Sequence, residues 1–227
     1  MENFQYILPE IFISVSIMLF LLVGVFKKNS ASLIYNLSNI SLVILLALII
    51  NLSSLDTIYL FNESYLIDNL SNYMKIILVG SGIFVMLTGS KYIQEINLNK
   101  IEYPILILSS ILGMMIMISS NDLIVFYMGL ELQSLALYVL ASFNRDNLLS
   151  TESGLKYFVL SALSSGLLLY GCSLTYGFSE STNFDQILIN STEFNYGTTF
   201  GIVFILVGLA FKISAVPFHM WAPDVYQ

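Results

Sequence analysis

The chain has 227 residues, of which 57% are hydrophobic and only 10% are charged. A soluble domain carries roughly 25% charged residues, and one core could not bury so much apolar surface. The composition therefore excludes a soluble enzyme, a nucleic-acid-binding protein and a disordered chain. The net charge of −7 disfavours phosphate backbones as partners, and the single cysteine, Cys172, excludes a disulfide scaffold.

Seven apolar runs follow one another along the chain, each close to the length of about 20 residues that a membrane-spanning helix needs. They are apolar on every side, and lipid-exposed backbone must satisfy its own hydrogen bonds, so helices are expected. We therefore predict an all-α polytopic membrane protein with about seven transmembrane helices. The expected spans are 6–26, 32–52, 73–92, 103–120, 122–143, 154–176 and 198–220.

Charge in the connections predicts the orientation of the helices. Basic residues gather in three alternate connections, and the opposite connections hold acidic residues and no basic ones. Because basic connections stay on the inner side, the N-terminus is expected outside and the last residues inside. The basic set is Lys27, Lys28, Lys91, Lys100, Arg145 and Lys156, and the acidic set is Asp56, Glu63, Asp68, Asp122, Glu180, Asp185 and Glu193.

The first apolar run does not resemble a cleaved signal peptide, because Lys27 and Lys28 follow it and no basic residue precedes it. No Arg-rich transit peptide precedes it either. The chain is therefore expected in a bacterial inner membrane or, as an organelle gene product, in the mitochondrial inner membrane. The many Asn, Ile and Lys residues suggest an AT-rich genome, and we favour the mitochondrial location.

Two charged residues lie deep within expected spans, Glu131 in 122–143 and Lys212 in 198–220. A charge at the bilayer centre costs about 2.5–3.5 kcal/mol on insertion scales, and such residues usually pair and mark ion or proton paths. Movement of Glu131 away from Lys212 would change the affinity of the lysine for its proton. The alternative is a structural ion pair that only holds two helices together.

The segment after Lys212 has features of a broken helix. Pro217 lacks a backbone donor and clashes with the carbonyl of Ile213, so the helix should break beside Lys212. His219 could relay a proton, although an interfacial residue is an equal alternative. Trp221 is expected to be an anchor at the membrane interface.

Other polar and small residues of the spans are weaker signals. Glu10 and Lys75 lie near span ends, where each could extend to the surface. A polar set could hydrate a path or pack helices: Gln133, Ser134, Ser161, Ser164 and Ser165. A glycine set is expected to permit close helix contact: Gly80, Gly82, Gly113, Gly166 and Gly171.

Two long segments, 119–140 and 211–226, resemble the antiporter-like membrane subunits of complex I, the proton-pumping NADH:quinone oxidoreductase. Within the first, Gly129-Leu130-Glu131-Leu132-Gln133-Ser134-Leu135 is similar to the subunit 2 family, called subunit N in bacteria. The openings Leu8-Pro9-Glu10 and Glu102-Tyr103-Pro104 are similar to that family as well.

The resemblance implies a subunit that contains no redox centre and has no catalysis of its own. NADH, FMN, iron–sulfur clusters and quinone would be bound by other subunits, and this chain would hold no cofactor or metal. Protons would pass through Glu131, Lys212 and His219, beside the helix break at Pro217. Its partners would be the lipid bilayer and other membrane-arm subunits, with no nucleic acid.

The resemblance also implies an incomplete subunit, because family members contain two inverted repeats. This chain would comprise a three-helix region, 1–100, and the first four helices of one repeat, 101–227. A second chain or segment would supply the rest, unless the sequence is a fragment.

Two other functions stay open at this stage, a related cation/proton antiporter subunit and a structural membrane subunit without proton transfer. The segment 129–134 favours complex I over the antiporter. The intramembrane charges argue against a pure scaffold.

Overall fold

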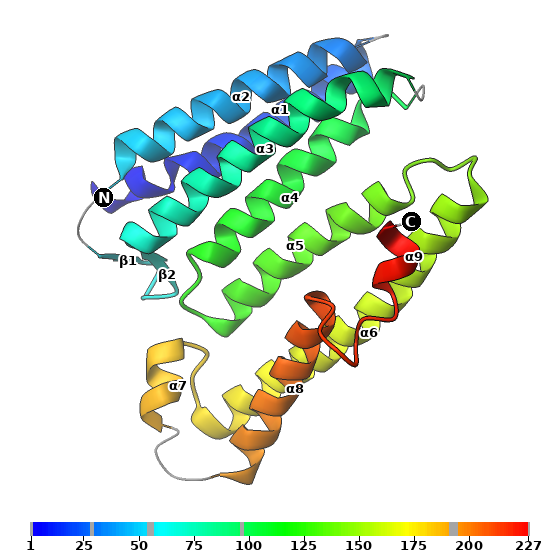
Figure 1. The fold of residues 1–227 in the computed structure, drawn as a ribbon. Helices are drawn as coiled ribbons and strands as arrows, with labels where there is room; N and C mark the ends of the chain where they lie inside the picture. The colour runs from blue at the N-terminus through cyan, green and yellow to red at the C-terminus, as the bar shows by residue number, and fades with distance from the viewer. Residues whose placement is uncertain (1, 28–29, 54–56, 96–97, 191–194, 227) are drawn as a thin grey trace.

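The computed structural model describes residues 2–27, 30–53, 57–95, 98–190 and 195–226, and these residues form long helices with one small hairpin (Figure 1). The 3-10 helix η1 (Glu2–Ile7) leads into the first helix. The other elements are α1 (Leu8–Phe26), α2 (Ala31–Leu52), β1 (Ile58–Leu60), β2 (Tyr65–Ile67), α3 (Asn69–Glu95), α4 (Glu102–Ile118), α5 (Leu123–Ala141), α6 (Leu148–Ser179), α7 (Phe184–Asn190), α8 (Tyr196–Lys212) and α9 (Ala222–Tyr226).

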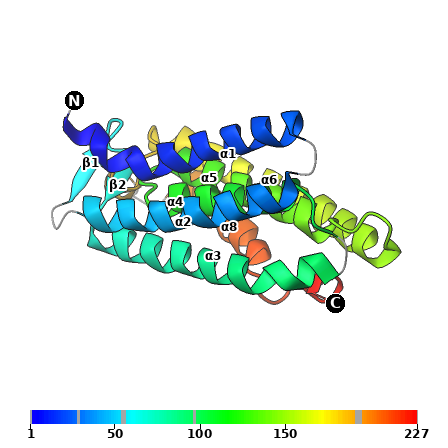
Figure 2. The same ribbon diagram turned by 90° about the horizontal axis from the view of Figure 1, so that it is seen from above.

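Helices α1 to α4 run side by side around one apolar core (Figures 1 and 2). Its centre consists of fully buried aliphatic and methionine side chains, because each of the four helices turns one face inward. The outward faces are also rich in large apolar side chains, as expected of helices that face lipid or other membrane helices. Core residues include Ile13, Ile34, Leu42, Leu45, Val79, Met86, Leu108 and Met115.

Helix α5 packs against α4, and α8 packs along α6 (Figure 1). Both contacts depend on glycine, because the backbones approach closely. A Cβ atom on Gly113 would lie 2.6 Å from the Gln133 nitrogen, and one on Gly171 would lie 2.7 Å from the Gly201 oxygen. These two positions fit the predicted close packing. Gly82 is also crowded, by the Ile111 side chain.

The same prediction is wrong at Gly80 and Gly166, where an added Cβ would meet nothing within 4 Å. These two glycines point away from neighbouring helices. A glycine in an apolar run therefore indicates close packing only when it lies on the face that meets another helix.

A hairpin and two loops join the helices at one end of the molecule. Strands β1 and β2 pair antiparallel, and the carbonyl oxygen of Glu63 in their turn accepts hydrogen bonds from the side-chain amides of Asn121 and Asn183, at 3.0 and 3.1 Å. Asn121 lies between α4 and α5, and Asn183 lies just before α7. The connections in which we expected only acidic charge thus meet at this end, which we call the acidic end.

The basic connections meet at the opposite end. The Lys100 ammonium lies 5.6 Å from the centre of the Phe143 ring, which brings the α3–α4 and α5–α6 connections together. Gly24, near the end of α1, is in contact with Ile101. The grouping of the connections by charge is therefore confirmed, and the side of the membrane that each end faces stays a prediction.

Each expected span corresponds to a helix in the described part of the chain. Five of these helices are long and apolar enough to cross a membrane by length and composition, whereas α4 and α8 are shorter apolar helices. The last span was placed too far along the chain, since α8 ends at Lys212 rather than at 220. Sequence analysis predicted neither the hairpin nor α7 and α9. The division at residue 100 stays a prediction, although α4 shares the core of α1 to α3.

Candidate functional site

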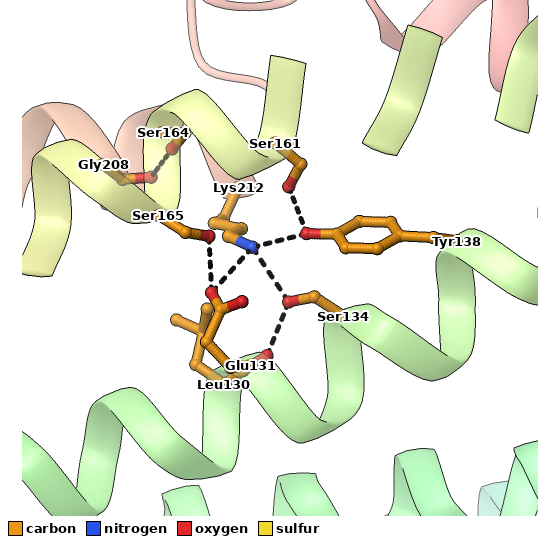
Figure 3. Close-up of polar contacts among 9 residues, drawn as sticks. All are labelled: Leu130, Glu131, Ser134, Tyr138, Ser161, Ser164, Ser165, Gly208 and Lys212. Atoms are coloured by element: carbon orange, nitrogen blue, oxygen red, sulfur yellow. Dashed lines mark hydrogen bonds and ion pairs between the residues drawn. The ribbon is translucent and has the colours of Figure 1, made fainter. Parts of the chain in front are cut away.

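Helix α5 carries three polar side chains of the site on one face. Its first turn is fixed by Asp122, whose Oδ1 accepts hydrogen bonds from the backbone nitrogens of Ile124 and Val125 at 2.7 and 3.3 Å. Glu131, Ser134 and Tyr138 follow at spacings of three and four residues, so they lie above one another on the helix. This face points toward α6 and α8 (Figure 3).

Lys212 is the last residue of helix α8. Ser214 has a positive φ of 56°, and its backbone nitrogen donates to the Phe211 oxygen at 3.1 Å. The Ala215 nitrogen donates to the Ala210 oxygen at 2.8 Å. These two bonds form a Schellman motif, which satisfies carbonyls that the ended helix leaves free. A cation is also favourable at this end of a helix.

The break beside Lys212 was predicted correctly, but its cause is different. We attributed it to a clash between Pro217 and the Ile213 carbonyl, whereas the helix has already ended at Lys212 through the Schellman motif. Pro217 is exposed in the irregular segment beyond that motif. It keeps the helix from resuming there, because the residue before a proline is disfavoured in helical conformation.

The Lys212 ammonium donates to three side-chain oxygens of α5. Its Nζ atom lies 2.9 Å from Ser134 Oγ, 2.9 Å from the Tyr138 hydroxyl and 3.4 Å from Glu131 Oε1 (Figure 3). The side chains of Lys212 and Glu131 are only 10% and 20% exposed. The two charged residues predicted from the sequence are therefore brought together, and the ammonium has an acceptor for each of its protons.

Helix α6 closes the site from the other side. The Ser165 hydroxyl donates to Glu131 Oε1, and the Tyr138 hydroxyl donates to Ser161 Oγ at 2.6 Å. Ser164 instead donates to the Gly208 oxygen at 3.0 Å, which ties α6 to α8. Of the polar residues that the sequence left ambiguous, Ser134, Ser161 and Ser165 thus line the site, whereas Ser164 joins helices.

The arrangement can change its hydrogen bonding without exposing a bare charge. Glu131 is one of three acceptors around the ammonium, and Ser165 remains as a donor to the carboxylate if Lys212 moves. The contact between Tyr138 and Ser161 extends the line of hydroxyl groups away from Lys212. Lines of this kind inside a membrane protein are typical of proton transfer.

His219, the third residue predicted to transfer protons, does not join the site. It lies in the irregular segment before α9 with an exposed side chain, and its ring makes no hydrogen bond to any residue that the structure describes. Its role in proton transfer stays a prediction.

Trp221 was expected to be an interfacial anchor, and this is wrong. It is 4% exposed and stacks on Tyr157, with ring centres 4.5 Å apart. Its indole nitrogen donates to the Phe211 oxygen at 3.1 Å. The ring therefore supports the end of α8 from inside the protein.

Sequence analysis missed two features. Tyr138 belongs to the recognised segment, but it was not singled out, although its spacing from Glu131 and Ser134 places it on the same face. Glu10 and Lys75 were expected to extend to the surface, and instead they form a buried ion pair with 2.7 Å between Nζ and Oε1. No local spacing could have shown this, since the two residues lie on different helices.

Metal-ligating side chains do not cluster in the described residues, where no group of three or more His, Cys, Asp or Glu could hold an ion.

The chain is similar to known membrane proteins of the NADH:quinone oxidoreductase and Mrp antiporter group. Residues 120–227 match the family described as NADH:quinone oxidoreductase/Mrp antiporter, TM. NADH-quinone oxidoreductase subunit N of Pelagibacter ubique is 67% identical over 229 residues, which cover 100% of this chain and 48% of that protein. The chain matches the N-terminal half of subunit N. It spans about half the length of the curated subunit N relatives.

Solved structures share the fold. A chain of respiratory complex I from Thermus thermophilus with bound aureothin superposes with a TM-score of 0.81 at 25% identity, covering 96% of this chain and 47% of that one. A chain of the Mrp complex from Dietzia sp. gives 0.80 at 18% identity, with coverage of 98% and 43%. The second match shows the fold alone.

The described part of the chain has five helices that are long and apolar enough to cross a membrane, in agreement with the predicted membrane protein. The mitochondrial location that we favoured finds no support, because the similar subunit N proteins are bacterial. An AT-rich codon bias reflects base composition rather than compartment, which is why it misled the prediction.

Proposed function

We propose that this chain forms part of a membrane-arm subunit of a proton-pumping NADH:quinone oxidoreductase, in which Glu131 and Lys212 carry protons. The observation that carries the proposal is the buried ammonium of Lys212, held by Glu131, Ser134 and Tyr138 at the end of a broken helix. NADH oxidation and quinone reduction would take place in other subunits. The 67% identity to a subunit N supports this choice.

The distances around the Lys212 ammonium favour proton transfer over a static pair. The Glu131 carboxylate lies at 3.4 Å from the ammonium, whereas the two neutral hydroxyls lie at 2.9 Å. Charge-assisted hydrogen bonds are usually short, about 2.7–2.9 Å, so the ammonium is not held tightly by this carboxylate. The neutral acceptors allow the carboxylate to move while the ammonium remains hydrogen-bonded.

The test uses membranes that contain the whole complex with Lys212→Met in this chain. Proton pumping is measured per NADH oxidised, and assembly of the complex is checked in the same preparation. We expect pumping per NADH to fall several-fold while the complex remains assembled. Lys91→Met is the matched control, since Lys91 is exposed near the basic end of α3. The complex with this variant should pump as the wild type does.

An assembled Lys212→Met complex with unchanged pumping would contradict the proposal and make the pair structural. His219→Gln in the same assay tests the remaining predicted residue. Reduced pumping with His219→Gln would place the His219 ring in the proton path, although the ring makes no hydrogen bond to the site residues in the described part of the chain.

The proposed location is a bacterial inner membrane, with other membrane-arm subunits as partners. The bacterial origin of the relatives supports the location, and their printed name as a subunit supports the partners. A second chain or segment that supplies the remaining length stays a prediction, which co-purification with this chain would test.

A cation/proton antiporter subunit is the second candidate, and the fold shared with the Mrp complex is the observation in its favour. Sodium-driven proton movement in vesicles without NADH would support it. Co-purification with iron–sulfur subunits would support the respiratory complex.

A further inference from the structure

A second buried cluster lies at the acidic end, away from Lys212. The Lys75 ammonium of α3 contacts Glu10 Oε1 of α1 at 2.7 Å, and the two side chains are only 3% and 8% exposed. The Tyr65 hydroxyl of β2 donates to the same oxygen at 2.8 Å. Lys75 and Tyr65 therefore both donate hydrogen bonds to one carboxylate oxygen of Glu10, and the three residues come from three different elements.

Tyr65 remains a hydrogen-bond donor in this cluster. Burial, together with the negative charge of Glu10, raises the pKa of the Tyr65 hydroxyl far above its usual value. The hydroxyl is therefore protonated at every physiological pH, and it keeps β2 attached to the ion pair.

Two buried polar atoms, one on Glu10 and one on α3, have no partner among the described residues. Oε2 of Glu10 is buried without a hydrogen bond, and so is Nδ2 of Asn72. Asn72 lies one helical turn before Lys75 on the buried face of α3. A buried polar atom without a partner is destabilising, so each of these atoms is expected to bind a small polar ligand.

The chemistry of these two atoms fits water. A carboxylate oxygen accepts a hydrogen bond and an amide nitrogen donates one, so water has the chemistry to satisfy each of them. Buried waters typically bind polar groups that the protein leaves unpaired. The Lys75 ammonium, bonded to the other oxygen of Glu10, is a polar neighbour of the carboxylate.

The cluster is connected to the start of α5 through the hairpin. The Leu66 nitrogen, next to Tyr65, donates to the Ser119 oxygen at 2.8 Å. The Asn121 nitrogen donates to the Ser64 oxygen at 2.9 Å. These bonds hold the turn that precedes Asp122, the residue that caps the helix carrying Glu131.

We propose that Glu10, Lys75 and Tyr65, completed by an internal water bound to Glu10 and Asn72, form an anchor that positions α5 and thereby sets the place of Glu131 opposite Lys212. Tyr65 and Asn72 are positioning residues, because they act through the hairpin and the bound water rather than on the transferred proton. The proposal deepens the proposed function and rests on it for its effect on pumping.

The test compares Tyr65→Phe and Asn72→Leu in the intact complex. Tyr65→Phe detaches the hairpin from an otherwise unchanged ion pair, and Asn72→Leu removes the donor for the water. Their matched controls are Tyr59→Phe, on the exposed strand of the same hairpin, and Asn69→Leu, exposed three residues before Asn72. Protons pumped per NADH are measured together with the infrared band of the Glu131 carboxyl group. This band is assigned by its absence in the Glu131→Gln variant.

We expect both anchor variants to assemble, to shift the Glu131 band and to pump several-fold fewer protons per NADH. Both controls should match the wild type. A density map of the wild-type complex, at a resolution that shows ordered water, should contain a water peak between Glu10 and Asn72. The density map of the Asn72→Leu complex should lack this peak.

Wild-type band positions and pumping in both anchor variants would overturn the positioning role, and a dry site in such a map would overturn the bound water. If Glu131→Gln and Lys212→Met pump normally while Tyr65→Phe still shifts the band, the proposed proton path fails and the anchor stands.

Discussion

The two buried lysine–glutamate pairs differ in how far each ammonium depends on its carboxylate. Lys75 lies 2.7 Å from Glu10, and its other hydrogen bond, to Tyr65, is long at 3.4 Å. Lys212 has the reverse pattern, with two hydroxyls at 2.9 Å and Glu131 at 3.4 Å. Glu10 is therefore the main acceptor of Lys75, whereas two neutral hydroxyls are the nearest acceptors of Lys212.

The surroundings strengthen this difference. Lys75 lies in the second turn of an unbroken helix, whereas Lys212 ends a helix and is followed by irregular chain. The same two residue types thus form pairs of different geometry, and the distances to the neutral acceptors distinguish them.

The largest expected effect comes from removal of the tightly held lysine. Lys75→Met leaves the Glu10 carboxylate buried without its cation, which typically costs about 3–5 kcal/mol of stability. Lys212→Met should cost less, because Glu131 is more exposed and keeps the Ser165 hydroxyl. The temperature at which this chain is released from the purified complex measures the stability loss in each variant. An equal loss of stability in the two variants would contradict the difference between the two pairs.

Replacement of both partners should reverse most of that loss. In Glu10→Gln/Lys75→Met no charge remains unpaired, and replacing a buried pair by neutral residues is often close to neutral. The same double-mutant cycle on Glu131 and Lys212 should give a smaller coupling energy. A larger coupling energy for the second pair would contradict the comparison.

Loss of a neutral acceptor should affect the Lys212 site moderately. Tyr138→Phe removes one of the ammonium's two short hydrogen bonds, and a bond to a charged group contributes about 1.5–3 kcal/mol. Pumping per NADH should fall less than in Lys212→Met, because Ser134 and Glu131 remain. Pumping at the wild-type level in an assembled complex would show that the carboxylate alone is sufficient.

The smallest effects concern the spacing of α6 and α8. Gly171→Ala forces a Cβ atom against the Gly201 oxygen, and overpacking of this kind costs about 1–3 kcal/mol. Gly166→Ala, on the open side of α6, should stabilise the helix by about 0.5–1 kcal/mol. The thermal shift of the complex should therefore have opposite signs in these two variants.

The sequence predicted the helices and the central pair because both depend on local or recognisable patterns. Long apolar runs require helices, and a glutamate and a lysine inside them have few partners other than each other. The pairing of Glu10 with Lys75 was out of reach, because it depends on how α1, α3 and the hairpin pack. Each residue, taken alone near a span end, is also consistent with extension to the surface.

The end of α8 shows a second kind of limit. The apolar run continues past Lys212, so hydropathy placed the boundary near 220. The helix ends earlier because Ser214 adopts a left-handed conformation and Trp221 binds the Phe211 carbonyl. Serine has no strong preference for that conformation, and the Trp221 contact forms only when the chain turns back. Neither feature has a signature in the run of residues itself.

The hydrogen bond between Asn183 and the Glu63 carbonyl joins residues 120 positions apart, and it has a consequence for biosynthesis. A growing chain enters the membrane from its N-terminal end, so the first four helices and the Glu10–Lys75 pair can pack while α6 is still being translated. The hairpin turn can form this hydrogen bond only when residue 183 has reached the acidic end. Closure of this turn therefore marks the moment at which the first six long helices have been inserted in their correct order.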